Sequence, residues 1–167
     1  MNRNLFITLL IIFNIAIDQI SKAIVRSNMI EGVRGQIDLI TDYFQLIWVE
    51  NKGAFLGMGS DMNPTLKLIF LLILPTLVLG YVIYYIVKTK ELDRLSLIAF
   101  CCIVGGGIAN VFDRIVYGQV TDFFFIRITD TIKTGIFNVA DLSVTTGMIM
   151  LLFSGVFTKK TKAEVEA

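Results

Sequence analysis

The segment from Leu66 to Val87, LKLIFLLILPTLVLGYVIYYIV, decides the fold class because it is almost entirely apolar. A helix of about 20 apolar residues spans the roughly 30 Å hydrocarbon core of a bilayer. Three more stretches share this character, at 5–20, 95–112 and 139–157. A backbone in lipid must satisfy its own polar groups, so all four stretches are predicted to be helices.

The composition of the 167-residue chain also indicates a membrane protein. Hydrophobic residues make up 55% of it, and the mean hydropathy is +0.74. A soluble domain of this size could not bury so much apolar side chain. The chain has no histidine, which excludes Ser-His-Asp and Cys-His catalysis and zinc sites of the His-Glu-x-x-His kind. A net charge of +1 without a basic patch argues against nucleic acid as a partner.

We therefore predict an all-α integral membrane protein that forms one domain over residues 1–167. The long connections are expected to face outward and to hold a small β-sheet, because aromatic and β-branched residues dominate 43–49 and 120–128. The polar tail at 158–167 is predicted to be disordered. The predicted transmembrane helices cover about 5–22, 64–87, 95–115 and 138–157, and the outward segments cover about 23–63 and 117–137.

Cations set the predicted orientation, because they concentrate in cytoplasmic segments. They are densest before the first helix, in the short connection after the second and beyond the fourth. Both termini are therefore predicted to be cytoplasmic, and the long connections to lie outside. The cations in question are Arg3, Lys88, Lys90, Arg94, Lys159, Lys160 and Lys162.

Under this topology four carboxylates lie at the outward helix ends or just beyond them: Asp18, Asp113, Asp122 and Asp141. Carboxylates near membrane depth are costly and mark functional sites. Two of them in a dry site share one proton, so that one can take a proton from water while the other polarises a peptide carbonyl. Asp122 and Asp141 are the candidates for this pair. A structural interpretation of Asp141 is equally open, because an acidic residue at a helix start stabilises the helix dipole.

The neighbours of these aspartates are polar or small. Asn138 and Asp141 share a helix face, and Gly105–Gly107 permits close helix packing. A structural ion pair is expected between Asp18 and Lys22, which are four residues apart. For Asp113 and Arg114 we also expect a salt bridge that ties helix ends together.

Taken together, the motifs resemble the lipoprotein signal peptidase family, also called signal peptidase II. Any single motif is weak, whereas five in the family's order along nearly the whole chain are specific. They are Asp18-Gln19 with Ser21-Lys22, Asn51-x-Gly53-Ala54-Phe55, Gly105-Gly106 through Asn110 to Asp113-Arg114, Val120-Thr121-Asp122-Phe123, and Phe137-Asn138-Val139-Ala140-Asp141. The chain departs from the family where Ala109 replaces a usual glycine and Gly107 a usual alanine.

The resemblance implies an aspartic peptidase of the bacterial cytoplasmic membrane, with its active site toward the outer face. Such an enzyme cuts before the diacylglyceryl-modified cysteine of a prolipoprotein, contacts membrane lipid, and is inhibited by globomycin. We expect a monomer without metal or cofactor. The resemblance makes Asp122 and Asp141 catalytic; the supporting residues are Asn51, Gly53, Asn110, Arg114 and Asn138, and the structural residues near the site are Asp18, Lys22 and Asp113.

Two alternatives differ in chemistry. A Ser/Lys peptidase would use Ser21 and Lys22, but adjacent helix residues do not face each other. A small proton-coupled carrier would need polar groups through the bilayer centre, where the first, second and fourth helices are nearly all apolar.

Overall fold

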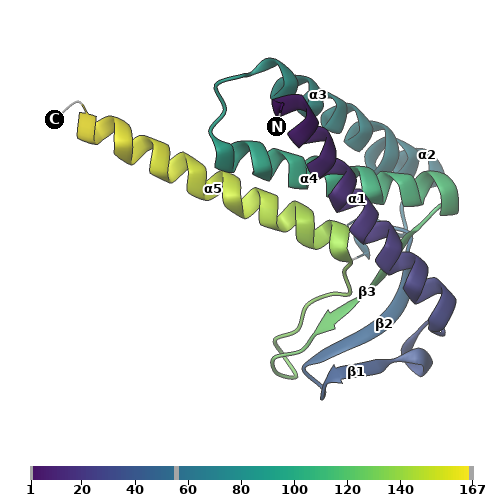
Figure 1. The fold of residues 1–167 in the computed structure, drawn as a ribbon. Helices are drawn as coiled ribbons and strands as arrows, with labels where there is room; N and C mark the ends of the chain where they lie inside the picture. The colour runs from purple at the N-terminus through teal and green to yellow at the C-terminus, as the bar shows by residue number, and fades with distance from the viewer. Residues whose placement is uncertain (1, 55–56, 166–167) are drawn as a thin grey trace.

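The computed structural model describes residues 2–54 and 57–165, with side chains described as far as Ser154. The helices pack together on one side of the molecule, and a small sheet lies beyond their ends on the other side (Figure 1). The elements in chain order are α1 (Arg3–Asn28), a short 3₁₀ turn (Val33–Gly35), β1 (Ile37–Ile40), β2 (Phe44–Asn51), α2 (Pro64–Lys67), a π-helical stretch (Leu68–Ile73), α3 (Leu74–Lys88), α4 (Arg94–Tyr117), β3 (Val120–Ile126) and α5 (Val139–Val165).

Within the described residues, three helical segments are long and apolar enough to cross a bilayer: Arg3–Asn28, Pro64–Lys88 and Arg94–Tyr117. A shorter apolar helix covers Val139–Ser154, the first part of α5. α5 then continues to Val165, past the predicted end at 157 and into the segment predicted to be disordered. Lysine, alanine and glutamate dominate this part of the chain, and all three are good helix formers.

The second span changes its winding at the middle. Its first turn begins at Asn63, whose side chain accepts a hydrogen bond from the Leu66 N–H, and a π-helical stretch then precedes α3. The N–H of Leu74 donates to the carbonyl of Ile69, which is the wider spacing of a π-turn. Pro75 follows directly. Its ring has no N–H and crowds the preceding turn, so local widening accommodates the proline without breaking the helix.

α4 packs against three other helices, and each of its three consecutive glycines faces a different one. It is therefore the central helix of the structure. A Cβ at Gly105 would lie 2.6 Å from Asn14 on α1, and one at Gly107 would lie 2.6 Å from Leu79 on α3. At Gly106 it would lie 2.4 Å from the carbonyl oxygen of Ala140 on α5. Small residues let membrane helices approach this closely, as the sequence predicted. Gly107, one of the two departures from the family pattern, therefore makes room for Leu79.

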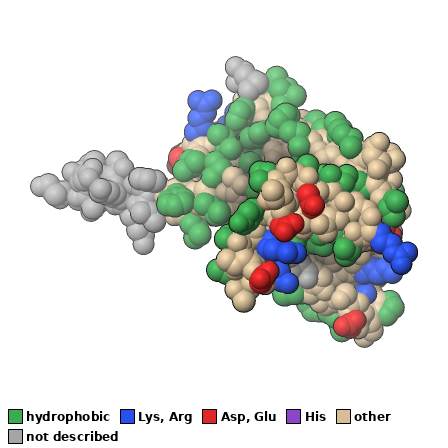
Figure 2. Space-filling view, turned by 90° about the horizontal axis from the view of Figure 1, so that it is seen from below, with side chains coloured by type: hydrophobic (Ala, Val, Ile, Leu, Met, Phe, Trp, Pro, Cys, Tyr) green, Lys and Arg blue, Asp and Glu red, His purple; other side chains and the backbone are tan. Residues whose placement is uncertain are grey.

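The sheet is antiparallel, with strand order β1-β2-β3. Gly118 ends α4 in the left-handed conformation (φ 74°) and turns the chain directly into β3. The register then pairs Val49 with Asp122 and Asn51 with Val120. Seen from the sheet end, charged side chains of both signs lie among apolar ones on this face (Figure 2). The predicted small sheet is thus present, and it sets Asp122 beside the end of β2.

Candidate active site

Asp122 is a buried carboxyl group, only 3% exposed, on β3. Its Oδ2 accepts a hydrogen bond from Asn51 Nδ2 at 2.9 Å, and its Oδ1 accepts one from Asn138 Nδ2 at 2.6 Å. The pKa of Asp122 is raised to about 7, chiefly by burial and also by the charge of nearby Asp141, while the two amide donors oppose the rise. The group therefore titrates near neutral pH, as a shared-proton mechanism requires.

Asp141 lies in the first turn of α5 and forms a capping box with Asn138. The backbone N–H of Asn138 donates to Asp141 Oδ2 at 3.2 Å, and the N–H of Asp141 donates to Asn138 Oδ1 at 2.9 Å. Such reciprocal bonds satisfy two free N–H groups of a helix start. Asn110 Nδ2 donates to the other oxygen, Oδ1, at 2.9 Å. The structural interpretation of Asp141 is therefore correct, and it does not compete with a chemical one, because the cap holds the carboxylate in place.

Asn138 connects the two aspartates. It is fully buried and hydrogen-bonds Asp122 with its side chain and Asp141 with its backbone and side chain. Its Nδ2 also lies 3.2 Å from Asn110 Oδ1. The structure thus brings together residues from α4, β3 and α5 that are far apart in the sequence, with both carboxylates on one asparagine.

Behind this site lies a fully buried ionic cluster centred on Lys22. Its Nζ lies 2.8 Å from Asp18 Oδ2, 2.8 Å from Asp113 Oδ2 and 2.9 Å from Asn110 Oδ1. Asp18 Oδ1 in turn accepts the backbone N–H of Ala140 at 2.8 Å. The expected Asp18–Lys22 pair is confirmed. Because a buried charge is costly unless paired and hydrogen-bonded, the cluster ties α1, α4 and the start of α5 together.

The salt bridge expected to tie helix ends together is confirmed for Asp113, whereas among the described residues Arg114 forms hydrogen bonds and no salt bridge. Asp113 turns toward α1 and pairs with Lys22, whereas Arg114 donates to the Gly53 carbonyl at 2.9 Å and to the Asn110 carbonyl at 3.2 Å. Adjacent residues of a helix point in different directions, which explains the separate partners. Arg114 therefore joins α4 to the loop after β2.

Asn51 organises that loop. Its Oδ1 accepts the Gly53 N–H at 2.8 Å, while its Nδ2 reaches the Ala54 carbonyl at 3.0 Å as well as Asp122. A Cβ at Gly53 would lie 2.5 Å from the Met58 carbonyl oxygen, so glycine is required there. Phe55, the last residue of this motif, lies outside the described residues.

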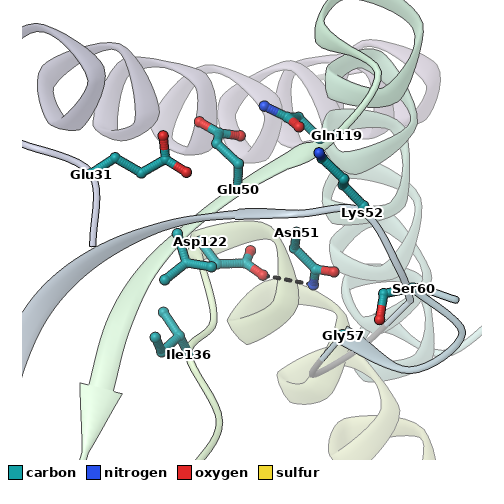
Figure 3. A pocket seen from close by; sticks show the side chains of 10 residues that line it. Glu31, Glu50, Asn51, Lys52, Gly57, Ser60, Gln119, Asp122 and Ile136 are labelled. Atoms are coloured by element: carbon teal, nitrogen blue, oxygen red, sulfur yellow. Dashed lines mark hydrogen bonds between the residues drawn. The ribbon is translucent and has the colours of Figure 1, made fainter. Parts of the chain in front are cut away.

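Two separate cavities adjoin the carboxylates. Asp122 and Asn51 line one of about 620 Å³, together with polar side chains of the connections that follow α1 and α4 (Figure 3). Asp141 lines another of about 340 Å³, with Phe137, Leu142 and Thr145.

Two residues near the site had no role assigned from the sequence. They are Gln19, which donates a hydrogen bond to Asp113 Oδ1 at 2.9 Å, and Glu50, which lines the larger cavity. The position of Gln19 beside Asp18 was the only signal for it.

Among the described residues, no group of three or more His, Cys, Asp or Glu side chains could hold a metal ion. The polar centre consists of two carboxyl groups and three asparagine amides, which come from strands β2 and β3 and from the helices α4 and α5 beside them. This is the arrangement of a membrane aspartic peptidase.

Comparison with known proteins identifies the family. The signature of peptidase family A8, described as Signal peptidase (SPase) II, matches residues 10–157. The lipoprotein signal peptidase of Clostridium novyi (strain NT) is 36% identical over 143 residues, which cover 86% of this chain and 92% of that protein. That of Borrelia duttonii (strain Ly) is 34% identical over 164 residues, 95% of each chain. The chain belongs to the signal peptidase II family, and it is a multi-pass protein of the bacterial inner membrane.

The fold agrees with a solved relative. A bacterial membrane enzyme determined by the in meso method at 2.3 Å resolution superposes with a TM-score of 0.81 at 25% identity. The match covers 94% of this chain and 91% of that one.

Proposed function

We propose that this enzyme removes the signal peptides of prolipoproteins by cutting the bond before a diacylglyceryl-modified cysteine, with Asp122 and Asp141 as its catalytic pair. One observation carries the proposal: Asn138 hydrogen-bonds both the buried carboxyl group of Asp122 on β3 and the half-buried one of Asp141 at the start of α5. The alternative of a proton-coupled carrier is not favoured, because the family is one of peptidases.

The raised pKa of Asp122 supports a division of roles between the two carboxyl groups. Below about pH 7 Asp122 keeps its proton and polarises the scissile carbonyl, and in the proposed mechanism the ionised form of Asp141 takes a proton from the attacking water. The water oxygen bonds to the carbonyl carbon, and the carbonyl oxygen takes the proton of Asp122. Asp141 then passes its proton to the leaving nitrogen as the peptide bond breaks, and Asp122 recovers a proton from the collapsing intermediate. Asn51, Asn110 and Asn138 hold the carboxylates throughout.

The proposal includes a defined topology. Four spans, with α5 as the fourth, leave both termini in the cytoplasm and the carboxylate pair at the outer face. The density of cations at the opposite helix ends supports this orientation. We further propose that a monomer suffices, that membrane lipid borders the site, and that globomycin inhibits the enzyme.

The test is mass spectrometry of a diacylglyceryl-cysteine peptide incubated with purified protein. Asp122→Asn and Asp141→Asn keep the size of each side chain but cannot share a proton, so both are expected to abolish cleavage while remaining folded. Asp42→Asn, at an exposed position of the sheet region, is the matched control and should cleave normally. Full cleavage by either of the first two variants would overturn the assignment.

A further inference from the structure

The two carboxylates open onto cavities of different character. The 620 Å³ cavity beside Asp122 is lined only by residues of the outward segments, including Glu31, Glu50, Lys52 and Gln119 (Figure 3). The 340 Å³ cavity beside Asp141 is lined by 133–135 and Phe137 of the connection before α5 and by Asp141, Leu142 and Thr145 in its first turns. One cavity thus lies wholly outside the spans, and the other extends from the connection onto the start of α5.

The difference between the two cavities predicts which end of the substrate peptide lies toward each of them. A signal peptide is an apolar segment that remains among membrane helices, whereas the chain after the cut is exported and polar. A peptide bond held between the two carboxylates therefore has its apolar side toward α5 and its other side toward the outward segments. We propose that the cavity beside Asp122 binds the first residues that follow the lipidated cysteine and that its fixed charges select among them. This inference rests on the proposed function.

Glu50 is the fixed anion in this cavity. Its Oε1 accepts hydrogen bonds from Trp48 Nε1 at 2.7 Å and from Thr121 Oγ1 at 3.1 Å. Among the described side chains, ion pairs involve only Lys22, Asp18 and Asp113, so the charge of Glu50 is not cancelled by a direct partner. Two neutral donors therefore hold a half-buried carboxylate that can act on a substrate side chain.

Charged groups of both signs surround Glu50. Glu31 adds a second anion and Lys52 a cation to the same cavity. Arg26 contacts Thr121 Oγ1 at 2.9 Å, next to Glu50. Because these charges nearly balance overall, selection depends on which group lies closest to the substrate side chain. We assign this role to Glu50, because two hydrogen bonds hold its carboxylate in place at the cavity wall.

The experiment uses three lipidated peptides that carry Lys, Gln or Glu directly after the cysteine. We expect the wild-type kcat/KM for the Lys peptide to exceed that for the Glu peptide about three- to fivefold, the range of a partly exposed charge pair. Glu50→Gln should bring this ratio toward one, and Lys52→Gln should increase it. Asp42→Asn, which lies outside the cavity, should leave the ratio unchanged, and high salt should reduce it in the wild type.

The possible results distinguish a failure of the proposed function from a failure of the cavity assignment. If the wild type cleaves none of the peptides, the proposed function fails. If it cleaves all three with equal kcat/KM, or if Asp42→Asn shifts the ratio as much as Glu50→Gln, the cavity assignment is overturned and the function stands. Glu31→Gln serves as a second variant should Glu50→Gln not fold, because Glu31 is exposed. A ratio that moves with neither Glu31→Gln nor Lys52→Gln would also overturn the assignment.

Discussion

Replacing Gly106 by alanine tests whether the contact between α4 and α5 sets the position of Asp141. The new Cβ would lie 2.4 Å from the Ala140 carbonyl oxygen and 2.9 Å from Val144 Cγ2. A carbon rarely approaches a carbonyl oxygen more closely than about 3.3 Å, so the start of α5 must move by about 1 Å. Ala140 precedes Asp141 directly, and its N–H is bonded to Asp18, so this displacement reaches the carboxylate pair.

A displacement of about 1 Å at reacting groups can lower a rate about 100-fold, and overpacking costs about 1–3 kcal/mol of stability. We therefore expect Gly106→Ala to fold, to unfold at a lower temperature, and to lose about two orders of magnitude in kcat. The assay is cleavage of the lipidated peptide, followed by mass spectrometry, with thermal unfolding in the same detergent.

Gly80→Ala is the matched control, because Gly80 lies in α3 and a Cβ there would meet no atom within 4 Å. It should cleave at the wild-type rate and unfold at the same or a slightly higher temperature, since alanine favours a helix. A folded Gly106→Ala enzyme with wild-type kcat would refute the argument that this contact positions the site.

Three further predictions concern the charged centre. The rate should fall as the pH rises above about 7, because Asp122 then loses the proton that polarises the carbonyl; a kcat that climbs steadily from pH 6 to 9 would contradict this. Asn51→Ala removes a donor that lowers the pKa of Asp122, so the alkaline limb of the same profile should move to higher pH, and an unmoved limb would count against the bond. Lys22→Met leaves Asp18 and Asp113 buried without a cation and should cost about 3–5 kcal/mol, measured as a lower unfolding temperature in detergent; an unchanged temperature would show that the cluster does not stabilise the fold.

Hydropathy was sufficient to locate the apolar helices, but not where they end. The first helix was predicted to stop near residue 22, shortly after the apolar run ends at residue 20, yet α1 runs on to Asn28. Asp18 and Lys22 lie inside this helix, as the expected ion pair requires. The two charges face inward and pair, so they do not oppose the helix. A sequence pattern shows that a residue is charged, whereas the packing of α1 against α4 decides whether that charge is satisfied.

The site itself could be predicted where its members lie in local motifs. The spacing of Asn138 and Asp141 indicated a shared helix face, and the capping box follows from it. The partner of Asp113 could not be predicted, because it depends on which face of α4 meets α1. The cavity around Glu50 was missed for the same kind of reason, since its walls come from β2, β3 and the loops beside them, whose relative placement no periodicity describes.

The hydrogen bond from Ala140 to Asp18 joins positions 122 residues apart and so has a consequence for how the enzyme is made. A ribosome delivers α1 early and the start of α5 late, so a growing chain already carries Lys22 while residue 141 is still untranslated. No partial product can hold the carboxylate pair. The proposed catalytic pair is therefore completed in one step, when the start of α5 packs against α1 and α4, and an unfinished copy lacks it throughout its own synthesis.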